Sequence, residues 1–205
     1  MIGIGMLFGG SPLPSPNIED TILGASIEGM DRGDLRVLSV LTTWLGVHAP
    51  YVNADRLTKI VAGATPRVRA YWSGVAAARP SDRRLRRLAA AYDGPRVPLL
   101  GVGTEMHLQR RGADARFGAG PVIVPAGTLR DRAADVMTPE ELASRHDAYR
   151  WRVIIGPTYR ADVWAALEAD PDAKPAELAR RTYASFATAW TVRRDYRVVS
   201  GRGAA

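Results

Sequence analysis

Residues that start or stop helices recur at short intervals along this chain, and they limit it to a series of short helices. Asn17, Asn53 and Thr65 each precede an apolar, periodic segment and are suited to cap a helix N-terminus. Pro66 strengthens the third signal, because proline fits the first helical position. The spacing predicts helices from residue 18 to about 30, from 54 to 61 and from 66 to about 78.

Two more helices are expected in the first half of the chain. Apolar residues cover more than one face of the segment 34–47, so this helix should be mostly buried, and Pro50 stops it. A helix beginning at Ser81 should place three apolar residues on one face and four arginines on the other, and it should end at Asp93-Gly-Pro95. The apolar residues are Leu85, Leu88 and Tyr92, and the arginines are Arg83, Arg84, Arg86 and Arg87.

The character of the sequence changes in the segment 95–156. RVPLLGVG and TEMHLQRRG resemble two strands joined near Gly103, and PVIVP and RWRVIIG resemble two more. Thr138 and Glu141 form a capping-box pattern that predicts a helix to about His146. We therefore expect a mainly helical α+β fold in which helical modules flank a small β-sheet. Its expected parts are an arm (1–17), a helical module (18–94), a β-containing region (95–156) and a C-terminal helix-turn-helix (157–199).

The helix-turn-helix prediction depends on the stretch from Lys174 to Val199. A first helix is expected over 175–182, a turn over 183–185, and a second helix from Ser185, its N-cap, to about Tyr196. Residues 158–169 would supply a third helix. Leu178 and Thr182 would meet Ala189 and Val192 of the second helix, with the small Ala179 beside them where the two helices cross.

This register leaves Ser185, Phe186, Ala187, Trp190, Thr191 and Arg194 facing outward. Arg194 would suit a bidentate contact with guanine, and Thr191 or Ala187 a thymine methyl group. Ser185 and Thr188 would hold a phosphate at the helix N-terminus. Arg180, Arg181 and Arg193 would clamp the DNA backbone. An exposed Trp190 is unusual on such a face, and a core position for it would mean that the register is wrong by one residue.

The stretch resembles the bacterial helix-turn-helix pattern of winged-helix regulators at Leu178, Ala179, Ala189 and Val192. It departs from that pattern at Tyr183, where glycine is usual, so the turn should differ or be strained. Residues 155–197 also resemble small bacterial proteins encoded beside AbiE-type nucleotidyltransferase toxins. That resemblance implies an antitoxin or operon regulator and no catalytic residue.

Positive charge is concentrated in two stretches of a chain whose net charge is +7. Residues 67–87 hold seven arginines and one aspartate, and residues 174–202 hold Lys174 and six arginines against two acidic residues. The first stretch predicts a second DNA contact through its arginines. These candidates are Arg67, Arg69, Arg83, Arg84 and Arg87.

Patterns for enzymes, cofactors and metals are weak in this sequence. The chain has no cysteine, and none of its three histidines has a metal-ligand partner at the spacing that zinc sites use. We expect no cofactor and no metal. Glu105 and His107 would share one face of the predicted strand. They would act as an acid–base pair only if the protein were an enzyme. The apolar N-terminus is too short to span a bilayer, which favours a cytoplasmic protein without a membrane partner.

The function expected from the sequence is sequence-specific binding of double-stranded DNA by a transcriptional regulator or an antitoxin-type repressor. A homodimer is expected because two half-sites multiply affinity. The alternative is a non-enzymatic adaptor in a defence or toxin–antitoxin complex, with a toxin, another acidic protein or RNA as its partner.

Overall fold

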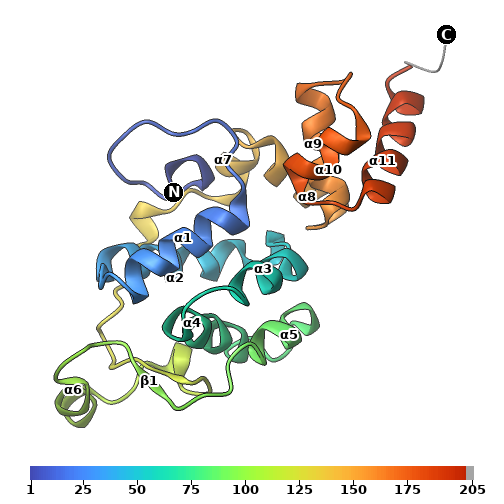
Figure 1. The fold of residues 1–205 in the computed structure, drawn as a ribbon. Helices are drawn as coiled ribbons and strands as arrows, with labels where there is room; N and C mark the ends of the chain where they lie inside the picture. The colour runs from blue at the N-terminus through green and yellow to red at the C-terminus, as the bar shows by residue number, and fades with distance from the viewer. Residues whose placement is uncertain (202–205) are drawn as a thin grey trace. The chain divides into compact units, whose positions relative to one another are not determined.

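The computed structural model describes residues 1–201, which form eleven short α-helices and one parallel sheet of two strands (Figure 1). The prediction of a mainly helical α+β protein is confirmed. The chain divides into two compact units, Met1–Met137 (unit 1) and Thr138–Ala205 (unit 2). The boundary falls within the segment 95–156, which the sequence pattern suggests is one region.

Three of the first four helices begin at the residues that the sequence predicts, and the second begins one residue later. The four helices are α1 (Ile18–Met30), α2 (Leu35–His48), α3 (Ala54–Val61) and α4 (Pro66–Ala77). The side chains of Asn17, Asn53 and Thr65 each accept a hydrogen bond from the backbone amide three residues later. These caps satisfy amides that the first helical turn leaves unpaired, so local chemistry determines where the helices start.

Large aromatic side chains fill the core of unit 1. Trp44, Tyr71 and Trp72 are fully buried. Each indole nitrogen has a partner: Trp44 donates to the carbonyl of Ile4 at 2.8 Å, and Trp72 donates to the hydroxyl of Ser26 at 2.9 Å. Burial of these rings therefore leaves no indole donor unsatisfied.

The N-terminal segment is packed into unit 1 through residues that the sequence suggests belong to an arm. Ile4 and Met6 are fully buried, and Met6 pairs with Val136 in an antiparallel bridge. The backbone amide of Met137 donates to the carbonyl of Gly5 at 2.9 Å. The segment 1–6 thus holds the last residues of unit 1 in place.

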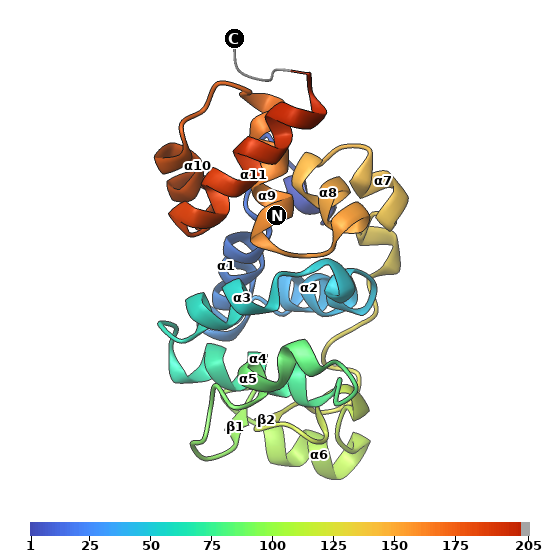
Figure 2. The same cartoon turned by 90° about the vertical axis from the view of Figure 1, so that its right-hand side faces the viewer.

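The small sheet pairs β1 (Val97–Pro98) with β2 (Val122–Ile123), and β2 packs against α4, beneath which both strands lie in Figure 2. Gly74 of α4 and Gly120 allow this approach. A Cβ atom on Gly120 would lie 2.4 Å from the Cα of Gly74, so only glycine fits there. The prediction of a strand in PVIVP is confirmed.

The second predicted strand, TEMHLQRRG, is wrong. These residues form α6 (Thr104–Arg111). The alternation of Met106 and Leu108 with polar neighbours suggested a strand, but most residues of this segment are strong helix formers and none of them is buried. Glu105 and His107 therefore do not share a face, since residues two apart diverge on a helix. The proposed acid–base pair has no geometric basis.

The predicted helix from Ser81 is shorter than expected. Asp82 caps a 3-10 turn, Arg83–Leu85, which leads into α5 (Arg86–Ala89). Leu85 and Leu88 are buried as predicted. Tyr92 lies beyond the helix, and its hydroxyl donates to the carbonyl of Pro95.

Unit 2 begins with α7 (Pro139–Ala143), and the predicted capping box between Thr138 and Glu141 is present. The predicted strand RWRVIIG is wrong, because these residues continue α8 (Asp147–Ile155), which His146 caps through its side chain. The β-branched run at its end suggested a strand, but an ion pair decides otherwise. Arg152 and Asp162 form two buried contacts of 2.8 and 3.0 Å that hold α8 against α9 (Tyr159–Ala169).

Candidate nucleic-acid interface

The helix-turn-helix segment forms a three-helix group around one small core (Figure 1). The group consists of α9, α10 (Pro175–Thr182) and α11 (Phe186–Val199). Leu178 of α10 and Ala189 and Val192 of α11 are fully buried against residues of α9. The inward residues and the third helix are therefore placed as predicted, and Trp190, with 51% of its surface exposed, confirms the register.

The turn between α10 and α11 contains a strained residue. Tyr183 has a φ of 59° and a ψ of 17°, a left-handed conformation that is uncommon for a tyrosine. It occupies the position where the helix-turn-helix pattern usually has glycine, so the predicted strain is present. Ser185 then caps α11, and its hydroxyl accepts from the amide of Thr188 at 3.1 Å.

The face of α11 opposite the core mixes aromatic and basic side chains. Ala187, Trp190 and Arg194 are exposed, and Phe186 at the helix start is 60% exposed. Thr191 is half-buried, so it lies at the edge of this face. Ser185 and Thr188 bond to each other through their hydroxyls at 2.9 Å, which orders the first turn of the helix.

Arg194, the residue expected to contact guanine, is held by its neighbours. Its guanidinium lies 5.6 Å from the centre of the Trp190 ring and donates to Asp195 at 2.9 Å. Asp195 also binds Arg160 of α9 at 3.2 Å. The Arg194 guanidinium, followed by that of Arg160, holds the pKa of Asp195 below its usual value. A base contact through Arg194 thus has to compete with an existing ion pair.

The three arginines expected to contact the DNA backbone differ in their exposure and in the ion pairs that they already form. Arg180 is exposed at the end of α10 and forms no ion pair with any residue from 1 to 201. Arg181 lies 3.6 Å from Glu177 and 3.8 Å from Asp170, which are loose contacts. Arg193 is half-buried, and its Nε is enclosed without a hydrogen-bond partner.

Within unit 1, two arginines of the second predicted DNA contact, Arg67 and Arg84, form hydrogen bonds that stabilise the fold. Arg67 donates to the carbonyls of Met30 and Leu99, and Arg84 donates to those of Pro50 and Val52 and also binds Asp82.

The remaining three arginines of this group vary in exposure. Arg69 is half-buried, whereas Arg83 and Arg87 are exposed. Arg87 pairs with Asp55 at 3.3 Å. Arg83 and Arg86 are exposed and form no ion pair with any described residue, so they are the arginines of 67–87 most open to a phosphate.

Asp195 and Arg160 are the residues of this surface that the sequence analysis missed. Neighbouring residues on a helix do not normally face each other, so the sequence gives no signal that Asp195 binds Arg194. Arg160 approaches Asp195 only because α9 packs beside α11.

Comparison of the sequence with protein-family models found no match, and comparisons with curated proteins and with solved structures found none either. The two family resemblances therefore stay predictions. Among residues 1–201, no helix is long and apolar enough to cross a bilayer, and no group of three or more His, Cys, Asp or Glu side chains is arranged to hold a metal ion.

Proposed function

We propose that this protein binds double-stranded DNA in a sequence-dependent manner through α10 and α11, as a transcriptional regulator or antitoxin-type repressor. The observation that carries the proposal is the turn at Tyr183. A strained, left-handed residue joins two helices that share a core with α9. The second helix then presents an exposed face of the kind that enters a major groove.

The charge of this surface supports the proposal. Three exposed arginines, Arg180, Arg181 and Arg197, lie at the ends of α10 and α11, and they can meet phosphates without leaving a buried partner unpaired. Trp190 and Arg194 precede Arg197 along α11 and would face base edges. In this arrangement phosphate contacts set the position of the protein, and the α11 face reads the sequence.

The experiment is a fluorescence-anisotropy titration of labelled duplex DNA at about 50 and 200 mM salt, a range over which phosphate contacts weaken markedly. The wild type is compared with Arg193→Ala/Arg194→Ala. The matched control is Arg110→Ala/Arg111→Ala, which removes two adjacent exposed arginines from α6 and lowers the net charge equally.

We expect the control to bind like the wild type. The α11 variant should lose about tenfold or more in affinity, and its log–log salt slope should fall by up to about 2. Equal losses in both variants would show that only net charge matters. Failure of the wild type to bind any duplex at low salt would overturn the proposal.

An adaptor role is the second candidate, and exposed apolar residues at the end of α8 favour it. Val153, Ile154 and Ile155 have 45%, 61% and 43% of their surfaces exposed. Such a cluster is typical of a protein interface. Capture of a partner protein that survives high salt, and that Ile154→Glu abolishes, would support this role over DNA binding.

A further inference from the structure

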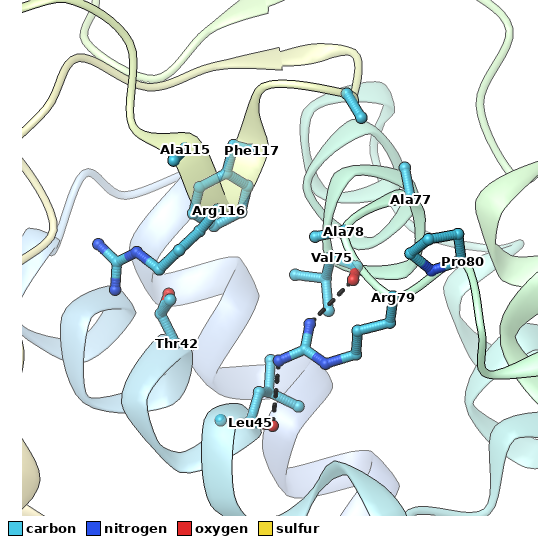
Figure 3. A pocket seen from close by; sticks show the side chains of 12 residues that line it. Thr42, Leu45, Val75, Ala77, Ala78, Arg79, Pro80, Ala115, Arg116 and Phe117 are labelled. Carbon is cyan, nitrogen blue, oxygen red and sulfur yellow. Dashed lines mark hydrogen bonds between the residues drawn. The ribbon is translucent and has the colours of Figure 1, made fainter.

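Residues of α2, α4 and the 3-10 turn Ala115–Phe117 line an open pocket of about 580 Å³ in unit 1 (Figure 3). Its walls are mainly apolar, with Leu45, Val75, Pro80 and Phe117 among the lining residues. This volume falls within the range of about 300–1,000 Å³ that is common for small-molecule sites. The pocket therefore has the size and lining of a ligand site.

Arg79 brings a positive charge to this apolar pocket. Its guanidinium donates to the carbonyl of Val75 at 2.9 Å and to that of Leu45 at 3.1 Å (Figure 3). These bonds use two of its five N–H donors and fix the group near the C-terminal ends of α4 and α2. In the described chain, no carboxylate lies within 4 Å of Arg79.

The environment of Arg79 makes this charge unusual. Burial lowers the pKa of Arg79, while Tyr71 and Asp82 act in the opposite direction. Asp82 itself binds Arg84 at 2.7 Å, so its charge is largely compensated there. A partly desolvated cation with unused donors favours a charged acceptor, because hydrogen bonds between ionised groups are the stronger kind.

Arg116 is the second arginine of the pocket, and its charge is already matched. Its Nε and Nη2 donate to the two carboxylate oxygens of Asp114 at 3.0 and 2.6 Å, and Nη2 also donates to the carbonyl of Leu129. In Figure 3 its guanidinium points away from that of Arg79. The pocket thus offers about one uncompensated positive charge, which suits a monoanion better than a doubly charged phosphate.

We propose that this pocket binds a small amphipathic carboxylate. The carboxylate pairs with Arg79, and the apolar part of the molecule packs against Val75, Pro80 and Phe117. This site lies within unit 1, whereas α10 and α11 belong to unit 2, and the proposal does not depend on DNA binding.

The test uses the full-length protein and three probes, benzoate, phenylacetate and hexanoate, each paired with its uncharged amide. Saturation-transfer NMR detects binding, and calorimetry measures affinity. We expect at least one carboxylate to bind with a dissociation constant of about 1 mM or lower, and its amide to bind about tenfold more weakly. No saturable binding of any carboxylate, or equal binding of acid and amide, would overturn the proposal.

Two variants and a control place the binding in the pocket. Arg79→Gln should bind the carboxylate about tenfold more weakly and leave amide binding unchanged. Arg96→Gln, which removes an exposed arginine outside the pocket, should have no effect. Since Arg79→Gln could disturb the two helix ends, Ala78→Leu supplies an independent test. It keeps Arg79 and fills part of the pocket, so unchanged carboxylate affinity in this variant would also overturn the proposal.

Discussion

At the scale of single residues, Tyr183 shows how the turn between α10 and α11 is made. Its left-handed backbone is unfavourable for any residue with a Cβ atom, by about 1–2 kcal/mol. Tyr183→Gly and Tyr183→Ala both remove the ring, but only glycine removes the strain. We expect the glycine variant to be more stable than the alanine variant by about 1 kcal/mol in urea unfolding. Equal stability of the two would mean that the turn relaxes when the ring is lost.

Asp195 limits the availability of Arg194, and removing its charge should strengthen DNA binding. Asp195→Asn frees the Arg194 guanidinium and removes one negative charge from α11. We expect roughly two- to fivefold tighter binding to duplex DNA at low salt, with little change in stability because the pair is exposed. The anisotropy titration checks this directly. The matched control is Asp172→Asn, which removes the charge of an exposed acidic residue before α10. An equal gain in affinity for this variant would show that net charge, and not release of Arg194, strengthens DNA binding.

His48 should make the stability of unit 1 depend on pH. Burial lowers its pKa to about 4, against a smaller upward effect of its hydrogen bond with the Met137 carbonyl. Between its ordinary value of about 6.5 and 4, the unfolded chain binds a proton that the folded chain excludes. Stability should therefore be full above about pH 6.5 and decrease as the pH falls toward 4, by on the order of 2 kcal/mol.

The measurement for His48 is urea unfolding at several pH values. His48→Gln should flatten the dependence between pH 6.5 and 4. His107→Gln, on α6, should retain it. Because His146 is buried as well, the difference between the two variants is the informative quantity, and identical curves would contradict the prediction.

At the scale of elements, a buried ion pair joins α8 to α9. Arg152 and Asp162 have only 1% and 6% of their side chains exposed. Removing one partner leaves a buried charge, so Asp162→Ala should cost about 3–5 kcal/mol of unfolding free energy. Arg152→Met/Asp162→Leu removes both charges and should cost less than the single change. A larger loss in the double variant would show that the pair itself supplies net stability.

At the scale of the whole molecule, two cores should respond separately to mutation. Leu178 is fully buried in unit 2, and Leu57 is 2% exposed in unit 1. Either leucine changed to alanine should cost about 2–5 kcal/mol. Hydrogen exchange should show lost protection mainly in α9, α10 and α11 for Leu178→Ala, and mainly in α1, α3 and α4 for Leu57→Ala. Loss spread evenly over both units in either variant would mean that they unfold as one.

The sequence by itself determined where five of the eleven helices in residues 1–201 begin. Asn17, Asn53, Thr65, Thr138 and Ser185 all cap the helices predicted from them. A cap bonds an amide three residues away, so its information is contained in a few neighbouring residues. The burial of Ala189 and Val192 could also be predicted from local sequence, because once the cap fixes the start of the helix, its period of 3.6 residues fixes which positions face inward.

Only the tertiary structure decided the state of the segment 150–155 and the roles of the arginines. Short apolar runs fit a strand or a helix equally well, and Arg152 selected the helix by pairing with Asp162 on the next helix. Arg67 and Arg84 reach backbone carbonyls more than thirty residues away in the sequence, and Arg79 reaches that of Leu45. Whether an arginine supports the fold or faces solvent depends on such distant partners, which no local pattern contains.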